Sequence, residues 1–581
     1  MKFSLRSSGT LCAVALLLSL SGCQRHRKTT SAPNTTNYSD ALQSLTTSSK
    51  IPFLRWPNIS DYQSAVKTFY DDRNYEIAWT RNGKPTPASH GFIQAFADAG
   101  AKGLNPEDYD SSLWEARIKA LSPQKTDSIA QFDVAMTVCV MRFISDLRIG
   151  RVNPQHFNFG VDVANKKYNL AEFVSDHAVD VTDVPKLLTT VEPDSELYRR
   201  AQQALARYVD LARQQEQQGA EPLPDVSASI TVGHAYPAAA QLFDRLKLEG
   251  DLDDADADTE PPKSTYTAVL SRGVKNFQHR HGFTEDGHLT SQTIAALNVP
   301  LSKRVEQLQD ALERWRWLPE PYLNPRLMVN LPEFVLRGYT PDNHLDFTMK
   351  VVVGKVVDEH QTPVLARMLR YIVFRPYWNV PTDIARKELV PHLEKDPHYL
   401  ETHNFEVVNT KGQPVPHYTA KQVAQGGVMV REKPGPKNSL GLVKFMFPNQ
   451  YDIYLHSTPA TQLFNRTRRD FSHGCVRVQH PDDLAVWLLD GQNDKDGQPW
   501  DLEKVQEAFN TGPDNHQVNL KTPVPIVIFY VTAEVEDDGE VHFFNDIYGY
   551  DEQLQQVLSK GPPYPIRPYP VAAKPKNGDT V

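Results

Sequence analysis

The stretch Tyr451-Asp452-Ile453-Tyr454-Leu455-His456-Ser457 carries the clearest structural signal in the chain. Its residues alternate in character. Successive side chains of a strand point to opposite faces, so Ile453 and Leu455 are expected to face a core. Tyr454 and His456 then point the other way. The pattern predicts a short β-strand that ends with the His456 ring off the apolar face.

A second stretch follows shortly: Phe471-Ser472-His473-Gly474-Cys475-Val476-Arg477-Val478. Gly474 allows backbone torsions that other residues avoid, just before Cys475. Directly after it, Pro481-Asp482-Asp483 has the proline and first-turn acids that are typical of a helix start. Cys475 is therefore expected on a tight loop between a strand and a helix, in polar surroundings.

The chemistry that Cys475 and His456 suggest is a thiol–imidazole pair. An imidazole can take the thiol proton, and the thiolate can then attack a carbonyl carbon. The N–H groups of Gly474 and Cys475 are candidates for holding the resulting oxyanion. A third group must orient His456, and spacing alone does not identify it.

Three other interpretations of this cluster compete. A core histidine and an unrelated cysteine would explain each residue singly. A metal site is conceivable because four potential ligands lie close in sequence: His456, His473, Cys475 and His480. However, the stretch has no C-x-x-C or H-E-x-x-H spacing. A purely structural Ser-His-Gly-Cys turn is the third alternative. We expect no metal here.

Short β-branched and aromatic runs bounded by Pro, Gly or Asn predict a mostly β domain over residues 320–550. They are residues 327–331, 349–353, 368–374, 443–447, 453–455 and 526–532. Residues 383–430 interrupt this pattern and are predicted to be an inserted cap. Residues 551–581 are predicted to be a Pro-rich C-terminal tail.

The first half of the chain has helical periodicity. Residues 49–220 are predicted to be a helical scaffold domain. In the unit 233–300, Leu270, Val274 and Phe277 recur at helical spacing, and Thr290 is a candidate N-cap. Residues 250–259 are an acidic insert that we expect to be a solvated loop. The chain as a whole is predicted to be a multidomain α+β protein.

The N-terminus has the features of an export signal. Lys2 and Arg6 precede a short apolar run at residues 11–20, and Leu20-Ser21-Gly22-Cys23 ends it. The stretch resembles a bacterial lipoprotein signal, which implies cleavage before Cys23 and lipidation of its sulfur. Residues 24–48 are polar and are predicted to be a flexible tether. Because Gln24 follows the cysteine, the resemblance implies the periplasmic side of the cell envelope, with a lipid anchor in the outer membrane.

Charge and cysteine content narrow the functional classes. The formal net charge of -9 gives no reason to expect nucleic acid as a partner. The four cysteines are Cys12, Cys23, Cys139 and Cys475. The last two are far apart and do not suggest a disulfide scaffold. Cys139 lies in an apolar helical stretch and is expected to be a buried small hydrophobe.

His456 followed by Ser472-His473-Gly474-Cys475-Val476-Arg477 resembles the signature of the L,D-transpeptidase (YkuD-type) catalytic domain. The flanks, Arg375-Pro376-Tyr377-Trp378-Asn379-Val380-Pro381 and Lys444-Phe445-Met446-Phe447-Pro448-Asn449, are similar to the large YcbB-type branch. That branch has a helical scaffold, a peptidoglycan-binding domain and a cap inserted in the catalytic domain. Residues 274–298 likewise resemble the small three-helix peptidoglycan-binding domain.

The resemblance implies roles for individual residues. Cys475 becomes the nucleophile and His456 the general base, while His473 shapes the catalytic loop. Ser457, or its backbone carbonyl, orients His456. Arg477 either contacts a substrate carboxylate or braces the loop through an ion pair. The remaining expected substrate-binding residues, some from the acyl channel, are Tyr377, Tyr454, Trp378 and Asn379.

The family activity implied is a two-step acyl transfer without metal or organic cofactor. Tetrapeptide stems of peptidoglycan form a thioester with Cys475, and an amine of another stem resolves it to a 3→3 cross-link. Carboxypeptidase side activity, acylation by carbapenems and contacts with cell-wall synthesis proteins are also implied. Two alternatives remain: an acceptor lysine on a wall-attached lipoprotein, or a non-catalytic wall-binding tether.

Overall fold

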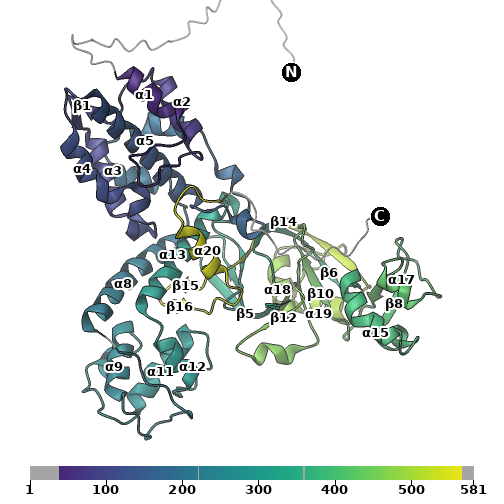
Figure 1. Ribbon diagram of the computed structural model, residues 1–581. Coiled ribbons are helices and arrows are strands. Elements are labelled where there is room, and N and C mark those ends of the chain that lie inside the picture. Colours follow the sequence, from purple (N-terminus) through teal and green to yellow (C-terminus); the bar gives the residue numbers. More distant parts are fainter. Residues whose placement is uncertain (1–37, 220, 358–359, 566–581) are drawn as a thin grey trace, which may run out of the picture. The chain divides into compact units, whose positions relative to one another are not determined.

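The computed structural model describes residues 38–219, 221–357 and 360–565 (Figure 1). Helices dominate up to residue 317, and strands dominate from residue 327 onward. This order agrees with the multidomain α+β prediction. The predicted signal peptide, Cys23 and most of the predicted tether lie outside the described residues, as do residues 566–581.

The N-terminal helical region is built around α5, which is buried along most of its length. Asp133 of α5 is fully buried and accepts hydrogen bonds from the backbone N–H groups of Ala78 and Trp79 and from the Tyr70 hydroxyl. The elements of this helical region are α1 (Ser39–Thr47), α2 (Gln63–Asp72), β1 (Thr80–Arg81), β2 (Lys84–Pro85), α3 (Pro87–Ala97), α4 (Trp114–Ala120), α5 (Thr126–Ile149), α6 (Leu170–Phe173), α7 (Val184–Thr189) and α8 (Glu196–Gln218).

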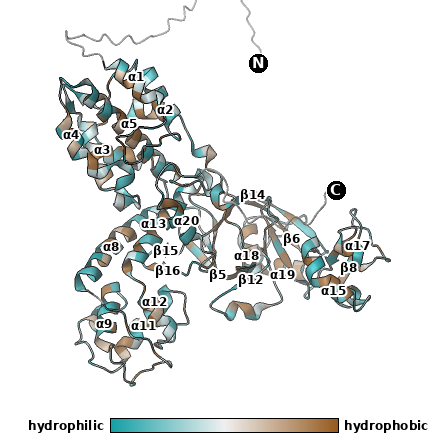
Figure 2. Cartoon of the chain, in the orientation of Figure 1, coloured by the Kyte–Doolittle hydropathy of each residue, from teal (hydrophilic) through white to brown (hydrophobic). Residues whose placement is uncertain are grey.

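Helix α5 also has the length and apolar composition of a membrane span, alone among the described residues. Of its most apolar window, 83% is buried inside the protein, as in the core helix of a folded domain. Cys139 lies on α5 and is fully buried, and burial raises the pKa of its thiol. Figure 2 colours each residue by hydropathy, with the apolar residues of α5 and the other helices in brown.

The prediction of a flexible tether up to residue 48 is wrong for its last part. Residues Ser39–Thr47 form α1, because Leu42 and Thr46 recur at one-turn spacing and are both buried against the helical core. Ala41 and Leu45 pack against the same core, and the polar composition of the segment concealed these few apolar contacts.

The next unit contains α9 (Ala239–Glu249), α10 (Asp254–Ala257), α11 (Ala268–Arg280) and α12 (Ser291–Leu297). Leu242, Phe243, Leu270, Val274, Phe277 and Ile294 form its core. Thr290 caps α12 as predicted, accepting from the Thr293 N–H at 3.2 Å. The acidic insert is more structured than expected: it includes α10, and its buried Asp251 pairs with Arg280.

Helix α13 (Leu301–Trp317) joins this unit to the β domain and had no sequence assignment. It packs along α8, and its Trp315 ring lies 4.8 Å from the Phe529 ring of the sheet.

The C-terminal sheet has nine strands in the order β12-β5-β13-β11-β10-β6-β14-β3-β4. Strand β4 also pairs with β5, so every strand except β12 belongs to a closed circuit of backbone pairing. The strands are β3 (Leu327–Asn330), β4 (Val335–Tyr339), β5 (Leu345–Gly354), β6 (Leu365–Phe374), β10 (Val443–Met446), β11 (Leu455–His456), β12 (Asp470–Ser472), β13 (Val476–Val478) and β14 (His516–Phe529).

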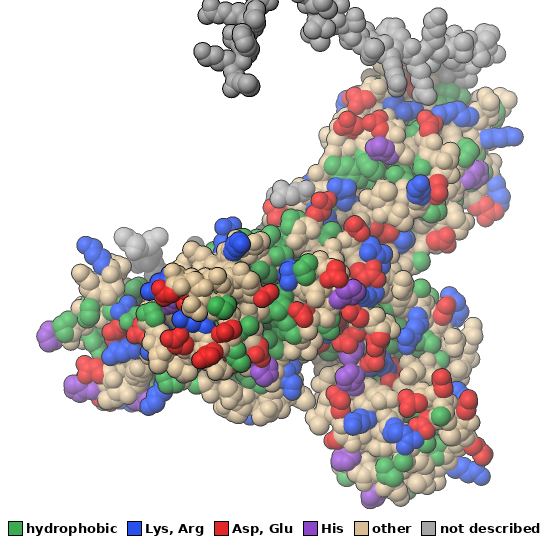
Figure 3. All heavy atoms as spheres, turned by 180° about the vertical axis from the view of Figure 1, so that it is seen from behind, with side chains coloured by type: hydrophobic (Ala, Val, Ile, Leu, Met, Phe, Trp, Pro, Cys, Tyr) green, Lys and Arg blue, Asp and Glu red, His purple; other side chains and the backbone are tan. Residues whose placement is uncertain are grey.

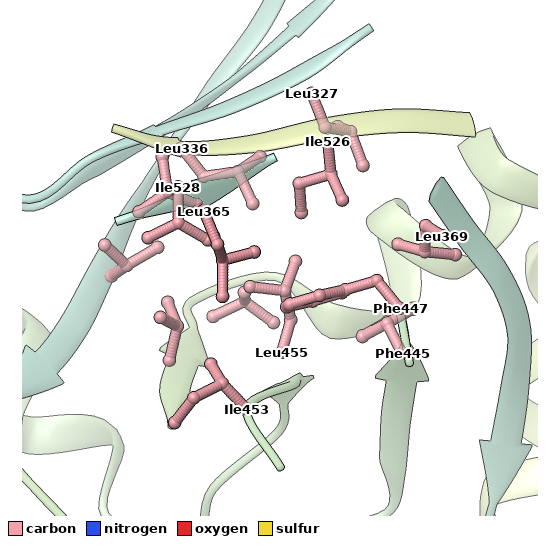
Figure 4. Packing of buried hydrophobic residues seen from close by; sticks show 14 of the residues in the cluster. Leu327, Leu336, Leu365, Leu369, Phe445, Phe447, Ile453, Leu455, Ile526 and Ile528 are labelled. Atoms are coloured by element: carbon pink, nitrogen blue, oxygen red, sulfur yellow. The ribbon is translucent and has the colours of Figure 1, made fainter. Parts of the chain in front are cut away.

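Apolar side chains from all sides of this circuit meet in one core (Figure 4). Leu327, Leu365, Phe445, Leu455 and Ile526 are each fully buried there. Helices α18 (Pro481–Leu489) and α19 (Leu502–Asn510) contribute further core residues, among them Leu484 and Val505. The inward face of β10 and β11 is thereby fixed, which also fixes the outward face.

An inserted subdomain separates β6 from β10. It contains a small sheet of order β7-β9-β8 and short helices around its own core, which includes Val380, Leu400, Val407 and Val430. Its elements are β7 (Trp378–Asn379), α14 (Thr382–Ile384), α15 (Val390–Leu393), α16 (Tyr399–Thr402), β8 (Phe405–Val408), α17 (Ala420–Ala424) and β9 (Met429–Glu432).

A hairpin and a helix follow the sheet: β15 (Ala533–Val535), β16 (Val541–Phe543) and α20 (Tyr550–Leu558). The predicted tail over residues 551–581 is therefore wrong for residues 551–558. Leu554 and Val557 face the core at helical spacing, a signal that the nearby prolines outweighed.

Candidate active site

The sheet register brings two predicted site residues, His456 and Arg477, into one row with Lys444, which the sequence did not single out. Lys444 of β10 pairs with His456 of β11, and His456 pairs with Arg477 of β13. Because side chains at paired positions share a face, all three project from the side opposite the core. Cys475 lies two residues before Arg477 and is the last residue before β13.

His456 is held in a defined tautomer. Its Nδ1 lies 2.6 Å from the backbone carbonyl oxygen of Ser457. A carbonyl only accepts hydrogen bonds, so Nδ1 carries the proton and Nε2 is the basic nitrogen. The Ser457 backbone carbonyl thus orients the ring, and the backbone of Leu440 also interacts with it. The Ser457 hydroxyl is packed against Gly441, where a Cβ would approach it to 2.4 Å.

Burial keeps both members of the pair neutral. Burial and the nearby Arg477 charge lower the pKa of His456 to about 3, against the opposing pull of the Ser457 carbonyl. Burial raises the pKa of the Cys475 thiol to about 11, and Tyr454 acts in the opposite direction. Both shifts favour a protonated thiol and a neutral imidazole at rest.

The thiol does not contact the imidazole in this resting arrangement. Cys475 Sγ donates to the backbone carbonyl oxygen of Asp452 at 3.8 Å, a weak contact. No hydrogen bond joins Cys475 to His456, although both residues are among those the structure describes.

The catalytic loop is braced by hydroxyl groups that the sequence did not single out. The Ser472 hydroxyl donates to the Cys475 carbonyl oxygen at 2.6 Å. The Thr362 hydroxyl donates to the Gly474 carbonyl oxygen at 2.7 Å and accepts from the Gly354 N–H. These contacts hold Gly474 at φ +121°, a torsion that favours glycine.

This bracing corrects the predicted oxyanion hole. The Gly474 N–H donates to the Ser472 hydroxyl at 3.1 Å, so it is already engaged. Among the described residues, the Cys475 N–H has no hydrogen-bond partner. Of the two predicted donors, only Cys475 N–H is free to meet an oxyanion.

Two partly buried cations, Lys444 and Arg477, interact electrostatically with the thiol. Burial lowers the pKa of both Lys444 and Arg477, and the nearby Cys475 opposes the shift in each case. Lys444 Nζ lies 5.5 Å from the centre of the Tyr454 ring, and Arg477 Nε is buried without a hydrogen-bond partner. Within the part of the chain that the structure describes, neither cation has an Asp or Glu at ion-pair distance.

The absence of an acidic partner among the described residues bears on the two hypotheses for Arg477, a contact with a substrate carboxylate or an ion pair that braces the loop. Arg477 makes no ion pair with any Asp or Glu that the structure describes, and its Nε is buried without a partner, which suits a carboxylate ligand. Lys444 was missed as a site residue because a single lysine on a strand is ordinarily solvent-facing.

His473 connects the catalytic loop to the inserted subdomain. Its Nε2 lies 2.7 Å from Oε1 of Glu388, which belongs to a π-helical turn at Ala385–Leu389. The His473 ring also meets the His360 ring edge-on at 4.8 Å. His473 therefore sets the position of the loop relative to the insertion.

Residues 324–526 match the family model of the L,D-transpeptidase catalytic domain. The chain carries an L,D-transpeptidase catalytic domain. Residues 64–205 match a scaffold domain, and residues 242–297 match a model described as "Putative peptidoglycan binding domain".

The chain is similar to a protein of Haemophilus influenzae named "Putative L,D-transpeptidase". The two are 31% identical over 277 residues, which cover 46% of this chain and 54% of the relative. The chain thus spans about half the length of the curated relative it matches.

The remaining predicted residues lie outside the row on the transpeptidase sheet. Trp378 and Asn379 form β7 and pair with Glu432 and Arg431 of β9. Arg431 lies over the ring of Tyr377 at 4.1 Å. None of these aromatic or amide groups hydrogen-bonds Cys475 or His456, so the structure assigns them to the inserted subdomain.

Proposed function

We propose that this protein is an L,D-transpeptidase that forms 3→3 cross-links between peptidoglycan stem peptides through a Cys475 thioester, with tetrapeptides as donors. The observation that carries the proposal is the His456 tautomer. Nδ1 is tied to the Ser457 carbonyl, which leaves Nε2 as the basic nitrogen, and His456 pairs with Arg477, two residues after Cys475.

The neutral pair favours attack with concerted proton transfer. As Cys475 Sγ bonds to the carbonyl carbon at the L-centre of the diaminopimelate residue, its proton passes to His456 Nε2. The oxyanion forms beside the free Cys475 N–H. The imidazolium then gives the proton to the nitrogen of the departing D-Ala, the C–N bond breaks, and the thioester remains.

The second step reverses the proton path. The side-chain amine of another stem attacks the thioester carbon and gives up a proton to His456, and Sγ leaves and is reprotonated. If water attacks instead, the product is a shortened stem, which is the carboxypeptidase side reaction. The chain's own groups provide the nucleophile, the base and an oxyanion donor.

The positive charges of Lys444 and Arg477 favour an acyl donor that carries a carboxylate. A tetrapeptide ends in a free carboxylate on the residue that leaves, and two partly buried cations with no carboxylate partner among the described residues interact electrostatically with Cys475. A carboxylate placed between them would satisfy both. The peptidoglycan-binding unit would raise the local concentration of wall substrate.

The envelope location and the lipid anchor at Cys23 belong to the same proposal and rest on the sequence. An enzyme that acts on the wall must be exported, and the leader pattern provides for that. Contacts with other wall-synthesis proteins remain part of the expectation.

The test is to incubate the protein with a disaccharide-tetrapeptide, or with meropenem, and to measure its intact mass and the soluble products. We expect a covalent adduct and tetrapeptide dimers from the wild type, and neither from Cys475→Ala. Cys139→Ala is the matched control, because it removes the other free thiol of the described chain and should leave both signals. A folded wild type that gives no adduct and no dimer would favour the wall-binding tether.

A further inference from the structure

A cluster of metal-binding side chains lies far along the chain from the transpeptidase site. His279 is on α11 of the peptidoglycan-binding unit, and Glu540 and His542 belong to the β15–β16 hairpin. The two elements are in direct contact, because the Arg280 guanidinium donates to the Val541 carbonyl oxygen at 3.3 Å. On the face shown in Figure 3, several His side chains lie among Asp and Glu.

The donor atoms converge. One ligand atom from each of His279, Glu540 and His542 lies within 4.8 Å of the others. The His279 and His542 rings meet edge-on with their centres 5.3 Å apart. A modest change of side-chain torsion would bring three such donors to the spacing of one coordination shell.

His542 provides an independent sign of a missing ligand. Its side chain is only 7% exposed, and its Nε2 is buried without a hydrogen-bond partner. The nearest charged atoms are Glu540 Oε1 at 3.4 Å and Glu536 Oε1 at 3.8 Å, neither of which makes a hydrogen bond to it. A buried polar nitrogen left in this state costs free energy unless something binds it.

The surroundings resemble the outer shell of a metal site. His279 Nδ1 contacts Glu285 Oε1 at 3.0 Å, which leaves Nε2 as the ring nitrogen for a ligand bond. A carboxylate on the second nitrogen of a ligating imidazole fixes its tautomer and orientation. His279, Glu285 and His542 also line a groove of about 890 Å³, which gives an ion a path from solvent.

Two imidazoles and one carboxylate form a donor set typical of zinc and its neighbours in the first transition row. We propose that His279, His542 and Glu540 bind one divalent transition-metal ion of the zinc class. Glu536 or water completes the shell. The ion ties α11 of the peptidoglycan-binding unit to the hairpin that follows the transpeptidase sheet.

The proposal does not depend on the transpeptidase reaction. The alternative is a network of ordinary His–Glu ion pairs with no ion. In that case removal of His279 would change surface charge but would not change the amount of metal bound.

The experiment measures zinc directly. Tag-free protein is dialysed against a zinc-buffered solution, and bound Zn²⁺ per chain is determined by elemental analysis for the wild type, His279→Ala, Glu540→Gln and Glu285→Gln. The matched control is His344→Ala, which removes an exposed histidine that also lies beside a carboxylate, Asp342 at 3.6 Å.

We expect one zinc per chain in the wild type and in His344→Ala. His279→Ala and Glu540→Gln should lose the ion, and Glu285→Gln should bind it about tenfold more weakly, the scale of an outer-shell loss. Zinc should also raise the Tm of the wild type and of His344→Ala but not that of His279→Ala. Equal zinc in wild type, His279→Ala and Glu540→Gln, or no zinc in the wild type, would overturn the proposal.

Discussion

His473 Nε2 and Glu388 Oε1 lie 2.7 Å apart and join the catalytic loop to the inserted subdomain. The two residues are distant in sequence, and each belongs to an element that packs on a different core. The contact therefore couples the position of the loop that bears Cys475 to the position of the insertion.

Glu388→Gln is expected to weaken this coupling. Glu388 is half-exposed, so the loss is of the order of an exposed ion pair, about 1 kcal/mol or less. That corresponds to an acylation rate constant lower by up to about fivefold. Stopped-flow acylation by a carbapenem measures it.

Glu401→Gln is the control for that change. It removes the partner of His398 at 3.3 Å, another exposed His–Glu pair in the same subdomain, and should leave acylation unchanged. If both variants acylate at the wild-type rate, the His473 contact does not position the loop.

Lys444→Gln is expected to reduce recognition of the donor carboxylate. A hydrogen bond to a charged group contributes about 1.5–3 kcal/mol, so kcat/KM for a tetrapeptide should fall by roughly 10- to 150-fold. A donor whose terminal carboxylate is amidated should lose far less. Dimer formation followed by chromatography measures both.

The exposed Lys437→Gln provides the comparison, since it changes the charge by the same amount on a nearby loop. An equal loss for the acid and the amide donor in Lys444→Gln would show that Lys444 acts on the fold or on Cys475 and does not bind the carboxylate.

Alkylation of the resting Cys475 should depend steeply on pH. Burial raises the pKa of this thiol to about 11, so between about pH 7 and 9 the thiolate fraction grows about tenfold per pH unit. The rate of reaction with iodoacetamide should grow in proportion, in a Cys139→Ala background. Intact mass over time measures it, and a rate that is flat across this range would indicate a preformed thiolate–imidazolium pair.

Thr362→Val should loosen the catalytic loop. The change removes the hydroxyl that donates to the Gly474 carbonyl and leaves a buried Gly354 N–H unpaired, at a cost of about 1–3 kcal/mol. Slower acylation together with a lower Tm is the expected result.

Thr362→Ser retains the hydroxyl and should restore the acylation rate. Should the serine variant behave like the valine variant, the methyl group of Thr362 and not its hydrogen bonds would be the important feature.

The sequence was most informative where one apolar face was regular. Strands β3 and β10 begin at the predicted residues, and His456 ends its strand as predicted. Strand β11 is shorter than predicted, because Asp452 adopts φ +52° and Ile453 N–H donates to the Asn449 side chain instead of a neighbouring strand.

Features that depend on distant partners could not be read from local patterns. The closure of β4 onto β5 depends on pairing between strands, and the occupied Gly474 N–H depends on the Ser472 side-chain torsion. Lys444 and Thr362 join the site only through register and packing. A hydroxyl or a lysine on a strand has no periodic signal of its own.

The parallel pairing of β11 with β13 also bears on how such sites can vary. His456 ends β11 and Cys475 directly precedes β13, so the pairing of these two strands fixes both positions. Between them, β12 is itself paired with β5, which leaves the connection over residues 457–469 outside the sheet. Doubling the length of a flexible connection costs only about 0.6 kcal/mol of closure free energy. Residues inserted in this connection would therefore change the sequence spacing of base and nucleophile while leaving their distance in space nearly the same.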